Sequence, residues 1–244
     1  NDVTVNVPCY RIDVMHPIDL VEDVAIAYGY NNIEPLWRDL PTTGAARPQQ
    51  HLIDIARELM IGSGYQEILT YTLTNPESLF TKMNHEKVET VDLYNPKVVT
   101  MTCLRNWLLP GLMEFLSVNQ SVAFPQKIFE LGKVTLFDET KETKTRDEEW
   151  LAAATSHANA GFSEIKASID AFLMNLGVSW QIKAISHPSF IEGRTGSVIV
   201  NGEEVGVIGE VNPIVLEAWK LENPTAAFEI NLQKILSNIN SQSQ

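Results

Sequence analysis

Residues 197–208 read Ser-Val-Ile-Val-Asn-Gly-Glu-Glu-Val-Gly-Val-Ile, and this stretch decides the fold class. Two strand-like runs, 197–200 and 205–208, flank the pair Asn201-Gly202. Asn-Gly is typical of a type I′ turn, which joins two antiparallel strands because its twist matches theirs. The stretch therefore predicts a β-hairpin, and it indicates a sheet whose strands are joined by hairpins.

The segments on either side of this hairpin are helices and strands in no regular alternation. Helices are predicted over 19–28, 49–61, 110–119, 163–176 and 213–221. Strands are predicted over 67–73, 88–93, 127–137, 150–156, 178–185 and 226–232. Because no βαβ rhythm and no glycine-rich strand-to-helix turn is present, the sequence predicts an α+β domain on a mostly antiparallel sheet.

Three stretches lie outside this pattern. Residues 138–149 hold six acidic residues, three basic residues and no apolar one, which predicts a solvated loop or hairpin tip. Residues 3–14 predict one or two short strands. Residues 31–46 include Pro35, Pro41 and Gly44, a composition typical of a linker.

The linker places a domain boundary near residue 40. The predicted domains are therefore residues 1–40 and residues 41–238, followed by a polar tail over 239–244 that we expect to be disordered. The chain does not start with Met and opens directly in strand-like alternation, so we expect a cut inside a longer protein.

The composition argues against several classes of protein. The chain has 244 residues, 18 of them Lys or Arg and 31 Asp or Glu, and the net charge of −13 argues against a broad basic surface for nucleic acid. No apolar run reaches the ~18 residues of a membrane span. Cys9 and Cys103 are too few for a disulfide framework or a structural zinc site. Without a leader-like N-terminus, a cytoplasmic location is expected.

Four carboxylates within eleven residues form the candidate metal site: Asp13, Asp19, Glu22 and Asp23. The last three share one face of the predicted helix, and carboxylate oxygens suit Mg²⁺. A second interpretation is helix capping, with Asp19 as the N-cap and Glu22 as its capping-box partner. Spacing alone favours capping, and the five histidines show no common ligand spacing.

Several blocks of sequence resemble one family. Residues 8–14 (PCYRIDV) and 19–33 (DLVEDVAIAYGYNNI) resemble the end of the B5 domain of the phenylalanyl-tRNA synthetase beta subunit, in its archaeal and eukaryotic type. Residues 104–112 (LRNWLLPGL) and 129–134 (FELGKV) resemble later parts of the same subunit. Further matches follow in the same order at 187–196, 206–213 and 227–232.

This resemblance implies a fold and a function. The chain would be the C-terminal part of a small winged-helix-like B5 domain, followed by a catalytic-like module with a class II synthetase sheet. The enzyme is an (αβ)₂ heterotetramer that joins phenylalanine to tRNA(Phe) using ATP, with its active site in the alpha subunit. This piece would be a non-catalytic assembly module that contacts no membrane.

The same resemblance implies that no residue of this chain is catalytic or binds a cofactor such as ATP. Class II catalysis needs an arginine where Ile128 stands, glycines where Glu229 and Asn231 stand, and an arginine where Lys234 stands. It further implies an Mg²⁺ site shared with the alpha subunit, formed here by Asp13, Asp19, Glu22 and Asp23.

Two other functions stay open at this point. One is a stand-alone class II-like enzyme that acts on a small acid with ATP, which the missing arginines disfavour. The other is a stand-alone tRNA-binding module, which the net charge of −13 disfavours. The apolar stripe of the helix at 49–61 predicts either a subunit interface or a helix buried within one domain.

Overall fold

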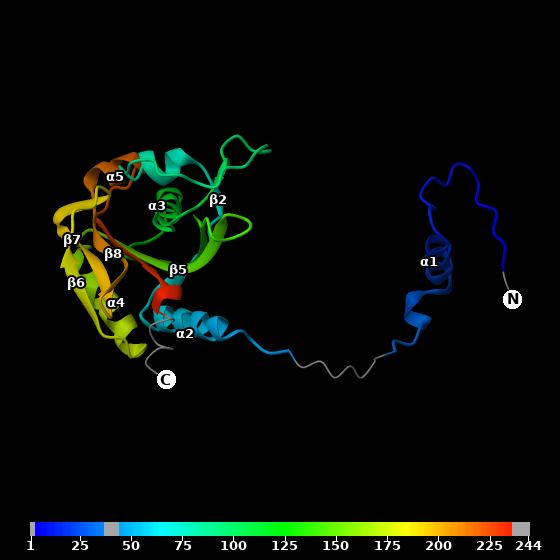
Figure 1. Ribbon diagram of the computed structural model, residues 1–244, viewed down its shortest axis with the longest axis horizontal. Coiled ribbons are helices and arrows are strands. Elements are labelled where there is room, and N and C mark those ends of the chain that lie inside the picture. The colour runs from blue at the N-terminus through cyan, green and yellow to red at the C-terminus, as the bar shows by residue number, and fades with distance from the viewer. Residues whose placement is uncertain (1–2, 37–43, 236–244) are drawn as a thin grey trace. The chain divides into compact units, whose positions relative to one another are not determined.

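The computed structural model describes residues 3–36 and 44–235 (Figure 1). The chain divides into two compact units, Asn1–Ala45 and Ala46–Gln244. The predicted polar tail and the predicted boundary near residue 40 lie outside the described residues.

The N-terminal unit contains the helix α1 (Pro17–Tyr28) and a 3-10 turn, η1 (Tyr30–Asn32). No residue of α1 is buried. The predicted strands within 3–14 are wrong, because the described residues before Pro17 form turns and pair with no neighbouring strand.

The predicted N-cap of α1 is also wrong. The cap is His16, because the fixed φ of Pro17 begins the helix two residues before Asp19. Asp19 instead occupies the third helical position, where its carboxylate accepts the N–H groups of Met15 at 2.9 Å and His16 at 2.8 Å. The helix ends as expected at Gly29, which has a φ of 93°.

The second unit is built on a seven-stranded sheet with the order β1-β4-β5-β9-β8-β7-β6. The strands, in the order of the sheet, are β1 (Gln66–Glu67), β4 (Gln126–Phe137), β5 (Thr145–Ser156), β9 (Thr225–Asn231), β8 (Glu203–Val211), β7 (Phe190–Val200) and β6 (Trp180–Ala184). Neighbours are antiparallel except β1 and β4, which are parallel. The α+β class is confirmed, but the sheet is mixed.

Helices cover both faces of this sheet (Figure 1). The helices α2 (Pro48–Gly62) and α4 (Phe162–Asn175) pack on one face. The helices α3 (Leu109–Val118) and α5 (Pro213–Ala218) pack on the other. The inner strand β5 carries three buried alanines, 152–154, whose small side chains let helices approach both faces closely.

The apolar stripe of α2 belongs to the core. Leu52, Ala56 and Met60 are buried, and the last two lie in the same cluster as Phe129 of β4 and Phe228 of β9. The structure therefore favours the buried-helix interpretation of this stripe over the interface interpretation.

The hairpin at 197–208 is confirmed, with positive φ at Asn201 (51°) and Gly202 (82°). The acidic stretch is a hairpin tip only over 138–144, since its second half lies in β5. The strands predicted at 67–73 and 88–93 are mostly absent. What remains is β1, a two-stranded ladder of β2 (Leu73–Thr74) with β3 (Cys103–Leu104), and one isolated bridge at Asp92.

Candidate functional site

Two buried carboxylates lie in one row on the face of the sheet that α3 covers. Glu130 of β4 pairs with Ala152 of β5, and Ala152 pairs with Glu229 of β9. Directly paired residues of an antiparallel ladder point to the same face. Glu130 is 0% exposed and Glu229 1%. Because an isolated buried charge is very costly, the contacts of each carboxylate decide how this face is built.

Glu130 is neutralised by a buried arginine. Arg105 lies 2.7 Å from Glu130 Oε1 through a guanidinium nitrogen. The Thr70 hydroxyl donates to Glu130 Oε2 at 2.6 Å and accepts from Arg105 at 2.8 Å. A Cβ on Gly132 would overlap the Arg105 guanidinium, so only glycine leaves room for the pair.

Arg105 also binds the outer edge of β4. Its Nε donates to the Lys133 carbonyl oxygen at 2.9 Å, and its own carbonyl oxygen accepts the Thr135 N–H at 3.0 Å. The sequence alone predicts no role for Arg105, Thr70 or Glu130. One signal for Glu130 is present in the sequence, because a single charge within an apolar strand run is rarely buried unless it is paired.

Glu229 holds the start of α3. Its carboxylate oxygens accept the backbone N–H groups of Leu108 at 2.8 Å and Leu109 at 3.0 Å. A negative charge is favourable there because these N–H groups have no partner inside the helix and the helix dipole is positive at this end. Burial raises the pKa of Glu229 to about 7, although the two N–H groups act in the opposite direction.

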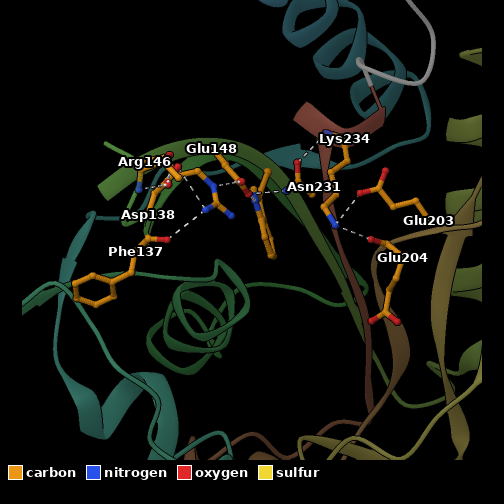
Figure 2. A network of polar contacts seen from close by, with 10 residues as sticks. Phe137, Asp138, Arg146, Glu148, Glu203, Glu204, Asn231 and Lys234 are labelled. Atoms are coloured by element: carbon orange, nitrogen blue, oxygen red, sulfur yellow. Dashed lines mark hydrogen bonds and ion pairs between the residues drawn. The ribbon is translucent and has the colours of Figure 1, made fainter. Parts of the chain in front are cut away.

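The other residues singled out at the implied ATP site also contact their own chain. Ile128 is buried beneath α3. The Asn231 amide donates to Glu148 Oε2 at 2.6 Å, and its oxygen accepts the Lys234 N–H at 3.0 Å (Figure 2). Lys234 Nζ donates to the Glu204 carbonyl oxygen at 2.9 Å and lies 3.1 Å from Glu203 Oε1.

Figure 2 shows that these contacts form one continuous network across three parts of the sheet. Arg146 Nε donates to Glu148 Oε1 at 2.7 Å, and an Arg146 terminal nitrogen donates to the Phe137 carbonyl oxygen at 3.2 Å. The network of contacts thus runs from the β4–β5 hairpin through the end of β9 to the β7–β8 hairpin. These contacts stabilise the sheet, and they hold the side chains of Asn231 and Lys234 in bonds within their own protein.

The four acids of the N-terminal unit are not gathered around one point. Arg11 makes a bidentate contact with Asp13 at 2.7 and 2.9 Å and binds Asp23 at 2.9 Å. The hydrogen bond from Arg11 lowers the pKa of Asp13. Asp19 accepts two backbone N–H groups, and Glu22 is exposed. Over residues 3–36 and 44–235, no group of three His, Cys, Asp or Glu side chains could hold a metal ion.

The donor chemistry of these acids suits Mg²⁺, but the geometry does not, because Arg11 occupies two of the four carboxylates. Mg²⁺ binding here stays a prediction.

Among the described helices, none has both the length and the apolar composition of a membrane-spanning segment.

Comparison with known proteins gives consistent matches. Residues 33–232 match the family model described as phenylalanyl tRNA synthetase beta chain CLM domain, and residues 1–30 match the tRNA synthetase B5 domain. The phenylalanine–tRNA ligase beta subunit of Pyrococcus abyssi is 49% identical over 228 residues, which is 93% of this chain and 41% of that protein. The corresponding subunit of Thermococcus sibiricus is 48% identical over 231 residues, 95% of this chain and 41% of that protein.

A more distant relative, the phenylalanine–tRNA ligase beta subunit of Korarchaeum cryptofilum, is 42% identical over 232 residues, 95% of this chain and 42% of that protein. The chain therefore spans about two fifths of the length of these curated relatives. The family resemblance seen in the sequence is confirmed.

Removing Arg105 alone should destabilise the chain far more than removing it together with its partner. Arg105→Met leaves Glu130 charged and buried, which costs about 3–5 kcal/mol, whereas Arg105→Met with Glu130→Leu removes both charges. Urea unfolding of the two single variants and the double variant measures the coupling.

The matched control is Lys166→Met, which breaks the exposed pair with Asp170 and should cost less than about 1 kcal/mol. Equal losses in Arg105→Met and the double variant would contradict the proposed importance of the pair.

Glu229→Gln should change how stability depends on pH. Since burial raises the pKa of Glu229 from 4.5 to about 7, the folded state holds this proton where the unfolded state has lost it. The contribution of Glu229 to stability is therefore present below pH ~4.5 and is lost as pH rises toward 7. The unfolding free energy of the original chain minus that of Glu229→Gln should fall by about 3 kcal/mol over this window.

Urea unfolding at pH 5, 6, 7 and 8 provides the measurement. The charged groups near Glu229 are Arg105 and Glu130, and both are unchanged in the variant. A difference that stays constant with pH would show that Glu229 titrates normally.

Proposed function

The chain belongs to the phenylalanyl-tRNA synthetase beta-subunit family, and from this membership we propose that it is a non-catalytic part of the enzyme. The complete enzyme would join phenylalanine to tRNA(Phe) with ATP, which is used at the alpha subunit. The chain would act in the cytoplasm within an (αβ)₂ heterotetramer, as a structural support for the active site of its partner.

The observation that carries this proposal is the contact between Glu229 and the start of α3. Binding a triphosphate needs cations or free N–H groups at the ligand. Here the N–H groups of Leu108 and Leu109 are bound to a buried carboxylate, and Ile128 beneath α3 is apolar. These contacts support the proposal that the chain's own helix fills the face on which a class II synthetase would hold ATP.

The mixed sheet supports the assignment of a class II-like module. Helices pack on both faces of its seven strands, and most neighbouring strands are antiparallel. The N-terminal unit would be the end of a B5 domain. The family matches to residues 1–30 and 33–232 also divide the chain in two, at an earlier residue than the compact units Asn1–Ala45 and Ala46–Gln244.

An exposed apolar surface lies at the β1 edge of the sheet. Leu69 (87% exposed), Tyr71 (78%) and Val118 (73%) line one pocket of about 410 Å³ together with Phe115. Phe115 also lines a second pocket beside it, with Val122. We assign the alpha subunit to this apolar edge, because large exposed apolar patches mark interaction surfaces and the proposed function supplies this partner.

The Mg²⁺ site would be completed in the assembled enzyme. Asp13, Asp19, Glu22 and Asp23 would supply oxygen ligands, some of them through water, because Mg²⁺ usually retains several waters. Arg11 would have to release Asp13 and Asp23. Bound Mg²⁺ would supply a positive charge that holds these acids and the partner together.

Charge placed at the apolar edge should block assembly. We expect Leu69→Asp combined with Tyr71→Asp to lower copurification with the alpha subunit at least tenfold, because two charges would be buried without partners. Gel filtration and pull-down measure assembly, while an unfolding curve checks that the variant stays folded.

Val99→Asp is the matched control, since Val99 is 88% exposed and lines neither pocket. Assembly that survives in the double variant would place the partner elsewhere.

The same preparations test the proposed function. ATP–pyrophosphate exchange with phenylalanine should require the alpha subunit, and exchange by this chain alone would favour a stand-alone enzyme.

Asp23→Asn should weaken Mg²⁺ binding in the assembled enzyme by about tenfold, because it keeps the shape of the side chain and removes its charge. Arg11→Gln should strengthen binding, since it removes the competing cation. Calorimetry with Mg²⁺ measures both, with Glu34→Gln as a control acid of the same unit. Equal Mg²⁺ affinity in all three variants would contradict the prediction and would show that these acids serve only in helix capping and ion pairing.

A further inference from the structure

A pocket of about 280 Å³ lies on the face of the sheet that carries Glu229. It is lined by Gly206 and Val207 of β8, by Trp107 just before α3, and by His85 and His187 from two loops. Its volume is close to the lower limit of small-molecule sites, which measure roughly 300–1,000 Å³. No residue of this pocket takes part in the proposed apolar edge except Trp107.

The walls of this pocket are aromatic. The ring centres of His85 and Trp107 are 5.7 Å apart, those of His85 and His187 5.4 Å, and those of Trp107 and His187 6.4 Å. Phe80 and Trp150 add two more aromatic side chains to the lining. Burial and the neighbouring His85 lower the pKa of His187 to about 4, so this ring is neutral at pH 7.

The charges in the lining are negative. Glu204 contributes an exposed carboxylate, whereas the carboxylate of Glu229 is buried and binds the N–H groups of Leu108 and Leu109. No Lys or Arg is among the described residues that line the pocket. An anionic ligand such as a phosphate or a carboxylate would be repelled, whereas a cation would be attracted. Aromatic faces add to this preference, because their quadrupole attracts cations by about 0.5–2 kcal/mol.

Two polar atoms in the wall have no hydrogen-bond partner. In the described part of the chain, neither Asn106 Oδ1 nor Trp107 Nε1 is paired, although both atoms are shielded from water. An unpaired buried polar atom costs about 1–3 kcal/mol, so such atoms are uncommon unless a ligand satisfies them. Asn106 Oδ1 requires a donor, which an ammonium group supplies after a small rotation of the side chain.

We propose that this pocket binds a small organic cation, an ammonium group carried on an aromatic ring. The ring would lie among Phe80, Trp107 and Trp150, and the ammonium would donate to Asn106 Oδ1. Binding at this pocket needs neither ATP nor the alpha subunit, so it does not rest on the proposed function.

A series of three ligands with one shape and different charge tests this proposal. Benzylammonium, benzyl alcohol and benzoate are titrated into the chain, with calorimetry and the NMR signal of the Trp107 indole N–H as readouts. Benzylammonium is expected to bind at least tenfold more tightly than benzyl alcohol, and benzoate most weakly. Equal affinities would show an apolar pocket without charge preference, and no binding by any of them would equally overturn the proposal.

Two variants locate the site. Val207→Phe fills the pocket and should lower the affinity for benzylammonium at least tenfold, whereas Val99→Phe, at an exposed position away from the pocket, should not change it. Glu204→Gln should weaken benzylammonium about fivefold and leave benzyl alcohol unchanged, because Glu204 is the exposed carboxylate of the lining. If Val207→Phe fails to fold, the charge series and Glu204→Gln still decide, and unchanged affinity in Glu204→Gln would count against the proposal.

Discussion

The cost of keeping two carboxylates away from water determines how the larger unit is built. Glu130 and Glu229 share one row of the sheet, and neither is accessible to solvent. Each must find its partners inside the protein. Glu130 forms an ion pair with Arg105, and Glu229 accepts hydrogen bonds from the first N–H groups of α3. The segment that carries Arg105 and begins α3 is thus fixed over the sheet at both of its ends.

Under the proposed function, this arrangement would let the sheet support an enzyme without catalysing a reaction itself. A catalytic face has to stay open and polar, with cations and N–H groups directed at the ligand. In this chain the corresponding donors and acceptors satisfy one another, and α3 packs its apolar side on Ile128 and the alanines of β5. Under the proposed function, the resulting rigidity would suit a subunit that positions another.

Local signals in the sequence were sufficient for some elements and not for others. The hairpin at Asn201-Gly202 was predictable because its turn chemistry is contained in adjacent residues. The partner of Glu130 was not, because Arg105 and Glu130 are brought together by the packing of distant segments. The start of α1 was misplaced because Pro17, rather than the better capping residue Asp19, decides where the helix begins. Strands at 3–14 were predicted from alternation, but alternation alone does not supply a neighbouring strand to pair with.

Arg105 has a second effect, on solubility. The strand β4 spans twelve residues, but its outer neighbour β1 spans only two, so most of this edge has no strand beside it. Arg105 occupies part of the gap through the Lys133 carbonyl oxygen and the Thr135 N–H. An unprotected edge is a template on which other chains can add a strand and aggregate. Arg105 thus blocks part of this edge against the addition of a strand from another chain.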